Sequence, residues 1–154
     1  GYSSAASDVY KRQVYGLALC YHYTHEEAIL PLFERVTKYF IDHLPEDYVP
    51  YWDLIFSDGS CEPRDTSAAA IAACGILEME KYYHNQEFLD IAKKMMSSLS
   101  EKYTTVDYLQ SNGIIKDGMY SRKHGHKSEC TSWGDYFYLE ALMRMKKSDW
   151  KIYW

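Results

Sequence analysis

The feature that most restricts the fold of this chain is a run of small residues from Thr66 to Ala73. It reads Thr-Ser-Ala-Ala-Ala-Ile-Ala-Ala and continues into Cys74 and Gly75, with no bulky polar residue before Glu78. A helix with such short side chains lets the backbones of neighbouring helices approach closely. We therefore expect this segment to form a helix at the crowded centre of a helical fold.

The composition suits one folded domain, or a piece of a larger one. The chain has 154 residues, of which 47% are hydrophobic, and its net charge is −5. An acidic chain without a long apolar run is not expected to bind nucleic acid or a membrane. The four cysteines are scattered, which favours free thiols in a reducing compartment. We expect a cytoplasmic protein; a periplasmic one is the alternative, with its signal in missing upstream sequence.

The first thirteen residues look foreign to the rest of the chain. The segment 8–13 reads Asp-Val-Tyr-Lys-Arg-Gln, which resembles the translation of a transposon-end sequencing adapter, and residues 1–7 carry no helical period. We expect residues 1–13 to be a non-native, disordered segment, and a natural disordered N-terminus is the alternative. The fold is then expected within residues 14–154.

The remaining chain reads as helices joined by irregular segments. Apolar residues recur near a period of 3.6 in the stretch 25–44, in which Pro31 is expected to kink or break the helix. Asp65 or Thr66 is expected to cap the small-residue helix, which runs to about Tyr82, and Asn85 to cap the next one. A hairpin or pair of turns is predicted between residues 104 and 131, and a last helix over residues 132–147.

An internal repeat predicts how these helices pack. When Gly16 is aligned with Gly75 without gaps, Tyr23 meets Tyr82 and Leu30 meets Leu89. Each unit is a small-sided helix, a tight turn and a longer amphipathic helix, and one such pair cannot bury both faces alone. The pattern favours stacked pairs in an αα-toroid, with the Ala-rich helices inside and the long loops together at one end. An ordinary helical bundle is the alternative.

Several residues have side chains suited to chemistry or binding. The basic stretch 116–127 contains four Lys and Arg residues and two histidines, and it suits a carboxylate or sulfate, although a solvated loop is the simpler interpretation. His124 and His126 with Cys130 lack a fourth zinc ligand, so no metal is expected. Four acids are candidates for acid/base catalysis, although Asp65 is favoured as a helix cap paired with Arg64: Asp53, Asp58, Glu62 and Asp65. Four aromatic rings could stack on a sugar: Tyr51, Trp52, Tyr120 and Trp133.

Three sequence blocks resemble glycoside hydrolase family 88, the unsaturated glucuronyl hydrolases. They are the stretch 45–79 with its Tyr-Trp-Asp and Arg-Asp-Thr-Ser-Ala-Ala-Ala motifs, the helix at 14–24, and the segment from Cys130 to Arg144 followed by the end at 149–154. The resemblance covers nearly all of residues 14–154. It implies an all-α (α/α)6 toroid, of which this chain is the C-terminal portion.

The resemblance also implies an activity. Members release a 4,5-unsaturated uronic acid from lyase-generated oligosaccharides: an Asp protonates the C4=C5 double bond and activates the water that adds at C5. No metal or organic cofactor is needed. The two catalytic Asp residues belong to the missing N-terminal half, so no catalytic residue is carried over and the isolated chain is expected to be inactive. The alternatives are an unsaturated rhamnogalacturonyl hydrolase of the same toroid and a helical-repeat binding scaffold without catalysis.

The resemblance assigns a substrate-binding role to a few positions of this chain. Tyr120 matches a substrate-side position of the family's C-terminal loop, and Ser121, Arg122 and Lys127 lie where members contact the anionic group or the next sugar. Trp133 completes the expected set. The expected partner is an unsaturated uronate-terminated oligosaccharide. Arg64 and Asp65 are expected to hold the start of the small-residue helix in place without contacting this ligand.

Overall fold

The protein is all-helical. A computed structural model describes residues 6–120, 129–147 and 149–152, and it contains no regular strand within these ranges. Isolated bridges join Thr104 to Ile115 and Gly118 to Glu129, where the sequence predicted a hairpin or turns. The helices are α1 (Ala6–Thr24), α2 (Ile29–Asp42), α3 (Thr66–Met79), α4 (Gln86–Lys102) and α5 (Ser132–Lys146).

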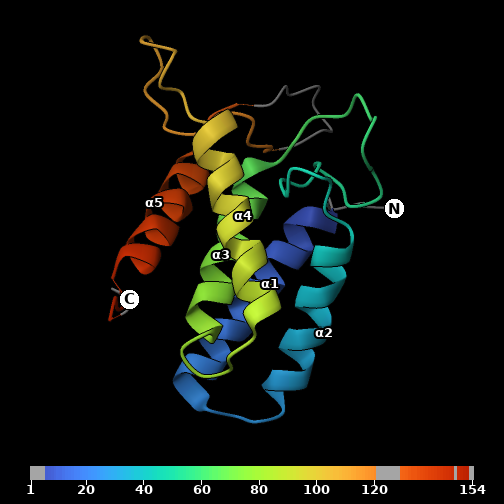
Figure 1. Ribbon diagram of the computed structural model, residues 1–154, viewed down its shortest axis with the longest axis vertical. Coiled ribbons are helices and arrows are strands. Elements are labelled where there is room, and N and C mark those ends of the chain that lie inside the picture. Colours follow the sequence, from blue (N-terminus) through green and yellow to red (C-terminus); the bar gives the residue numbers. More distant parts are fainter. Residues whose placement is uncertain (1–5, 121–128, 148, 153–154) are drawn as a thin grey trace.

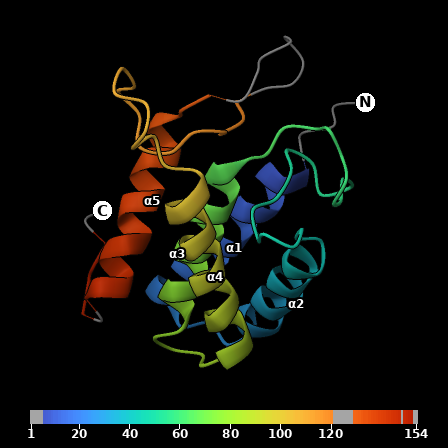
Figure 2. The ribbon, with the colours of Figure 1, turned by 45° about the horizontal axis from the view of Figure 1, so that its top comes forward.

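The helices form two stacked pairs and one further helix (Figures 1 and 2). Helix α3 lies between α1 and α5, α2 packs against α1, and α4 packs against α3. The small-sided helices α1 and α3 are therefore neighbours, and each carries its partner helix on the outside, although α2 with 14 residues is shorter than α1 with 19 rather than longer as predicted. This arrangement confirms the packing predicted from the internal repeat, and the helical class fits the predicted toroid.

The small residues of α3 explain its central place. Ala68, Ala69, Ala70, Ala72 and Ala73 are all fully buried. At Gly75 a Cβ atom would lie only 2.8 Å from the Tyr15 Cα of α1, so the two backbones touch there. Glycine is needed at this crossing because any side chain would push the two helices apart.

The N-terminal boundary differs from the prediction. Helix α1 begins at Ala6 rather than Val14, and the Lys11 side chain is 1% exposed. Residues 9–13 thus extend the helix instead of lying outside the fold. The periodicity explains this result, because Lys11 lies one helical turn before the buried Val14 and Tyr15 and faces the same neighbours. The foreign origin of residues 1–13 stays a prediction.

Other boundaries follow local chemistry. Pro31 does not break α2, because it lies in the first turn, where backbone N–H groups have no partner within the helix. Helix α3 ends at Met79, three residues earlier than predicted. Asn85 caps α4 as predicted, since its side chain accepts a hydrogen bond from the Phe88 N–H at 3.1 Å. Thr131 caps α5 in the same way, through the Gly134 N–H.

The irregular segments gather at one end of the helices, as the repeat predicted. The loop at 43–65 and the described parts of the segment 103–131 lie at the top of Figure 1, where α1, α3 and α5 begin. Any site built from these loops therefore also faces the first turns of these three helices.

Candidate substrate-binding site

A cavity of about 410 Å³ opens at the loop end, between the N-terminal parts of α1, α3 and α5. Its lining comes from two parts of the chain, which we call walls. We call the first the α1 wall, formed by Lys11, Arg12, Tyr15 and Gly16, and the second the aromatic wall, formed by Met119, Tyr120, Trp133 and Phe137; Ile71 of α3 lies between them.

Two of the residues predicted to bind substrate meet in this cavity. The rings of Tyr120 and Trp133 lie 5.8 Å apart between centroids, tilted by 49°, and Tyr120 is 66% exposed. The structure thus brings together residues from the loop before α5 and from its first turn. Their role in binding stays a prediction, and the other predicted residues, Ser121, Arg122 and Lys127, lie outside the described residues, as do His124 and His126.

Tyr15 and Phe137 extend the aromatic lining. Their rings meet edge to face, with centroids 5.3 Å apart. Burial raises the pKa of the Tyr15 hydroxyl well above its ordinary value, and the neighbouring Glu140 carboxylate raises it further. The hydroxyl therefore stays protonated at all physiological pH values and donates a hydrogen bond to Glu140 Oε1 at 2.9 Å.

The α1 wall also carries positive charge that the sequence reasoning missed. The Lys11 ammonium donates to Asp65 Oδ2 and to Ser67 Oγ, both at 2.9 Å. Lys11 and Arg12 belong to the segment that we expected to lie outside the fold, which is why neither was a candidate. The only available signal was the helical spacing of Lys11 relative to Tyr15 and Ala18.

The four candidate acids do not line the cavity. Asp53 and Asp58 accept hydrogen bonds from loop N–H groups, those of Ile55 and Glu46, and Glu62 accepts one from the Trp52 indole at 2.7 Å. Asp65 is buried and bound to Lys11. These contacts give all four carboxylates structural partners, and none of the four is among the residues that line the cavity.

The predicted pairing of Arg64 with Asp65 is wrong. Arg64 instead forms an ion pair with Asp47 at 3.2 Å, donates to the Val49 carbonyl at 2.7 Å, and lies over the Tyr51 ring. Asp65 occupies the N-cap position of α3, yet its side chain makes no capping hydrogen bond there. Its carboxylate turns toward Lys11 because a buried cation attracts it more strongly than a neutral N–H group does. The rings of Tyr51 and Trp52 do not line the cavity.

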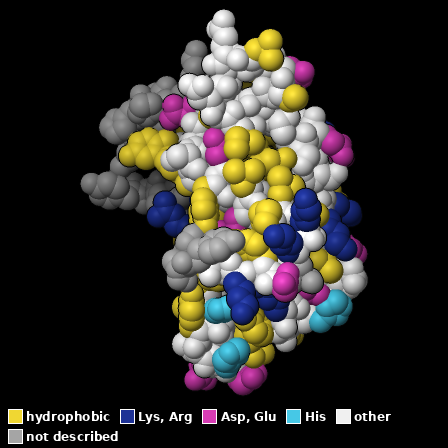
Figure 3. Space-filling model, turned by 90° about the vertical axis from the view of Figure 1, so that its left-hand side faces the viewer, with side chains coloured by type: hydrophobic (Ala, Val, Ile, Leu, Met, Phe, Trp, Pro, Cys, Tyr) yellow, Lys and Arg dark blue, Asp and Glu magenta, His cyan; other side chains and the backbone are white. Residues whose placement is uncertain are grey.

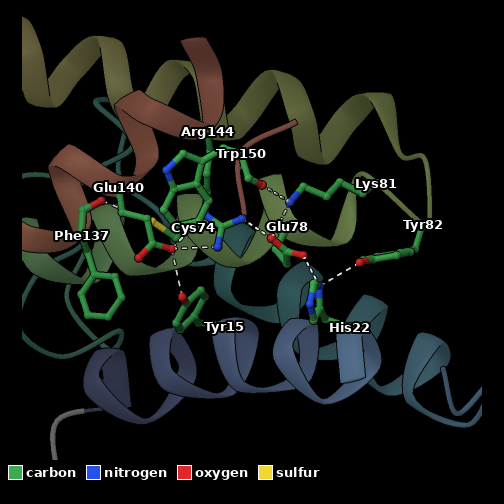
Figure 4. Close-up of polar contacts among 10 residues, drawn as sticks. All are labelled: Tyr15, His22, Cys74, Glu78, Lys81, Tyr82, Phe137, Glu140, Arg144 and Trp150. Carbon is green, nitrogen blue, oxygen red and sulfur yellow. Dashed lines mark hydrogen bonds and ion pairs between the residues drawn. The ribbon is translucent and has the colours of Figure 1, made fainter. Parts of the chain in front are cut away.

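A buried ion network joins the three inner helices below the cavity (Figure 4). Arg144 of α5 binds Glu78 of α3, and its Nε donates to Glu140 at 2.8 Å. Glu140 in turn accepts from Tyr15 of α1, and Glu78 contacts His22 of α1 at 2.7 Å. Burial by itself raises the pKa of Glu78, but hydrogen bonds from Lys81 and Arg144 outweigh it and hold that pKa below its ordinary value.

This network holds the helices that carry the cavity walls in a fixed register. Glu140 and Arg144 also lie one turn and two turns beyond Phe137, and the Cys74 thiol donates to the Phe137 carbonyl at 3.2 Å. Burial raises the pKa of Cys74, so this thiol is not a nucleophile at neutral pH.

The described residues contain no group of three or more His, Cys, Asp and Glu side chains able to hold a metal ion. No described helix has the length and apolarity needed to cross a bilayer.

Comparisons with known proteins find chains of similar sequence. The chain is 45% identical over 147 residues to the unsaturated chondroitin disaccharide hydrolase of Streptococcus pneumoniae, and 36% identical over 140 residues to the unsaturated glucuronyl hydrolase of a Bacillus species. These matches cover 92% and 87% of this chain. No family model matches the chain.

Solved structures give the same result. A variant of the Streptococcus agalactiae unsaturated glucuronyl hydrolase, complexed with dGlcA-GalNAc6S, superposes with a TM-score of 0.91 at 40% identity, over 100% of this chain and 42% of that one. The chain spans about two fifths of the length of the relatives that it matches, 37% in the two curated ones. The resemblance predicted from the sequence blocks is thus confirmed: the chain is similar to part of proteins named unsaturated glucuronyl hydrolase or unsaturated chondroitin disaccharide hydrolase.

Proposed function

We propose that this chain is part of an unsaturated glucuronyl hydrolase, in which it supplies one side of the cleft that binds a uronate-terminated oligosaccharide. The parent enzyme releases a 4,5-unsaturated uronic acid by hydrating the C4=C5 double bond. The observation that carries this proposal is the cavity at the loop end, which is lined by aromatic rings and by the cationic residue Arg12.

The cavity has the chemistry that such a ligand requires. Aromatic rings pack against the apolar C–H faces of sugar rings, and Tyr120, Trp133 and Tyr15 offer such faces within one cavity. Arg12 lines the cavity and provides positive charge for a carboxylate or a sulfate, whereas the Lys11 ammonium is already paired with Asp65. A volume of about 410 Å³ falls in the range typical of small-ligand sites, and the S. agalactiae relative was solved with the sulfated disaccharide dGlcA-GalNAc6S.

The catalytic carboxylates come from the rest of the parent protein. Hydration needs an acid within hydrogen-bond reach of the double bond, and none of Asp53, Asp58, Glu62 and Asp65 lines the cavity. Glu140 lies just behind Tyr15, but Tyr15 and Arg144 occupy its Oε1 atom. This chain therefore contributes binding and positioning, and the proton transfer to C4 and the addition of water at C5 depend on groups that it does not supply.

Calorimetric titration of the chain with dGlcA-GalNAc6S tests this proposal. We expect measurable binding, and we expect Trp133→Ala to weaken it about tenfold through loss of ring stacking. Trp52→Phe is the matched control, because Trp52 lies outside the cavity and should leave the affinity unchanged. No binding by the unaltered chain, or equal affinity in both variants, would reject the cavity as the binding site.

A further inference from the structure

We propose that Asp65 is a positioning residue that holds the two walls of the cavity at a fixed separation. The inference rests on the proposed function, since it concerns the same cavity, but Asp65 itself does not line that cavity. Asp65 is 2% exposed and precedes the first residue of α3.

The two oxygens of this one carboxylate bind residues of different walls. Oδ2 accepts a hydrogen bond from the Lys11 ammonium of the α1 wall at 2.9 Å. Oδ1 accepts one from the backbone N–H of Met119, in the aromatic wall, at 3.4 Å. Ser67 Oγ donates to Oδ1 at 2.6 Å and accepts from Lys11, which closes the cluster. A shift of either wall would therefore break a bond to the same side chain.

The backbone around Asp65 is itself held in place. Its N–H donates to the Pro50 carbonyl at 2.9 Å, which anchors it to the loop before α3. The next residue, Thr66, donates through its N–H to the Asp117 carbonyl at 3.0 Å and through its hydroxyl to the Lys116 carbonyl at 2.8 Å. The carboxylate thus projects from a fixed turn toward both walls.

The segment that leads to the aromatic wall requires such support. Asp117 has a φ of 61°, in the left-handed region that residues other than glycine rarely adopt. Gly118 then exchanges two backbone hydrogen bonds with Glu129, at 2.8 and 2.9 Å. Met119 and Tyr120 follow directly, so the hydrogen bond from Met119 to Asp65 fixes the direction in which the chain carries the Tyr120 ring.

Charge gives the Asp65 carboxylate its role beside Lys11 in this chain. The Lys11 ammonium is buried, and a buried cation is stable only beside an anion that also accepts its hydrogen bonds. Without the carboxylate, the Lys11 ammonium has a lower free energy in solvent than in the interior. It therefore moves out, and the first turns of α1 move with it. Asparagine keeps an acceptor for Met119 but removes the charge that holds Lys11, so the two walls can be released separately.

Hydrogen exchange of the full chain, with the variants Asp65→Asn and Asp65→Ala, tests this inference. We expect Asp65→Asn to raise exchange about tenfold in residues 9–16 while residues 117–120 stay protected, and Asp65→Ala to raise it in both segments. The matched control is Asp47→Asn, which removes a charge paired with Arg64 and an acceptor for the Tyr103 hydroxyl but touches neither wall. We expect Asp47→Asn to change the melting temperature but to leave hydrogen exchange in both segments unchanged.

Titration with dGlcA-GalNAc6S separates this inference from the proposed function. We expect both Asp65 variants to bind the disaccharide at least about fivefold more weakly than Asp47→Asn at a temperature where all are folded. Unchanged exchange in both segments of Asp65→Ala, or affinity equal to that of the control, would overturn the positioning role. If the unaltered chain does not bind the disaccharide, the proposed function fails, while the exchange data still decide whether Asp65 holds the walls. If Asp65→Ala does not fold, the contrast between the two segments in Asp65→Asn decides it.

Discussion

The hydroxyl of Tyr15 donates a hydrogen bond to Glu140 at 2.9 Å, which links the cavity to the buried ion network of α3 and α5. One face of the Tyr15 side chain lines the cavity, and its polar end is bound to the network. The stability of the inner helices and the shape of the cavity thus depend on the same residues.

We expect Arg144→Met to lower the free energy of unfolding by about 3–5 kcal/mol, because it leaves Glu78 and Glu140 buried without their shared cation. Denaturant unfolding measures this difference. Lys38→Met is the control, since the Lys38–Asp42 pair is exposed and contributes little to stability. Similar losses in the two variants would show that the network contributes no more than a surface ion pair.

The lowered pKa of Glu78 predicts a loss of stability in acid. A carboxylate whose folded-state pKa lies below its unfolded value stabilises the fold above the unfolded value, here 4.5, and this contribution is lost as the pH falls through the folded pKa. We expect the free energy of unfolding to fall below about pH 4.5. Glu78→Gln should be less stable at neutral pH and should show a shallower acid dependence; parallel pH profiles would contradict this origin.

The aligned glycines of the repeat should respond in opposite directions to alanine. Gly75→Ala places a methyl group 2.8 Å from the Tyr15 backbone, and such overpacking costs about 1–3 kcal/mol. Gly16 has no atom within 4 Å of the corresponding position, so Gly16→Ala should stabilise the chain by up to about 1 kcal/mol through helix propensity. Thermal unfolding of both variants checks this, and destabilisation by Gly16→Ala would contradict it.

An exposed apolar stripe on α5 predicts self-association of the isolated chain. Tyr136, Leu139, Leu142 and Met145 are 37–47% exposed, and hydrophobic side chains gather on the side of the molecule where α5 lies (Figure 3). We expect Leu139→Lys to shift the chain toward monomer in light scattering. The control is Leu109→Lys, because Leu109 is 97% exposed in a loop away from α5, and an equal shift in both variants would exclude the stripe as the cause.

The sequence predicted those parts of the fold that depend on local pattern. The alanine run of α3 indicated a crowded centre, and Asn85 indicated the start of α4, because both signals lie within a few residues. The pair of Tyr120 and Trp133 was expected from the family resemblance, and the structure places both in one cavity.

The contacts that support the site could not be predicted, because they join residues distant in sequence. Lys11 and Asp65 are 54 positions apart, and Glu78 and Arg144 are 66 apart. Each of these charged residues looks solvent-exposed in its own helix, and only the packing of α1, α3 and α5 shows that it is buried beside a partner. For Asp65, a local pairing with Arg64 was the wrong choice for the same reason.

The most direct test of the central claim is an absorbance assay with a chimera. In it, this chain replaces the matching 147 residues of the Streptococcus pneumoniae relative. The conjugated double bond of dGlcA-GalNAc6S absorbs in the ultraviolet, and hydration removes that absorbance. We predict that the chimera removes it, with the unaltered relative measured alongside as the reference, and that the purified 154-residue chain does not. A folded chimera that leaves the absorbance unchanged, or activity in the chain alone, would contradict the claim.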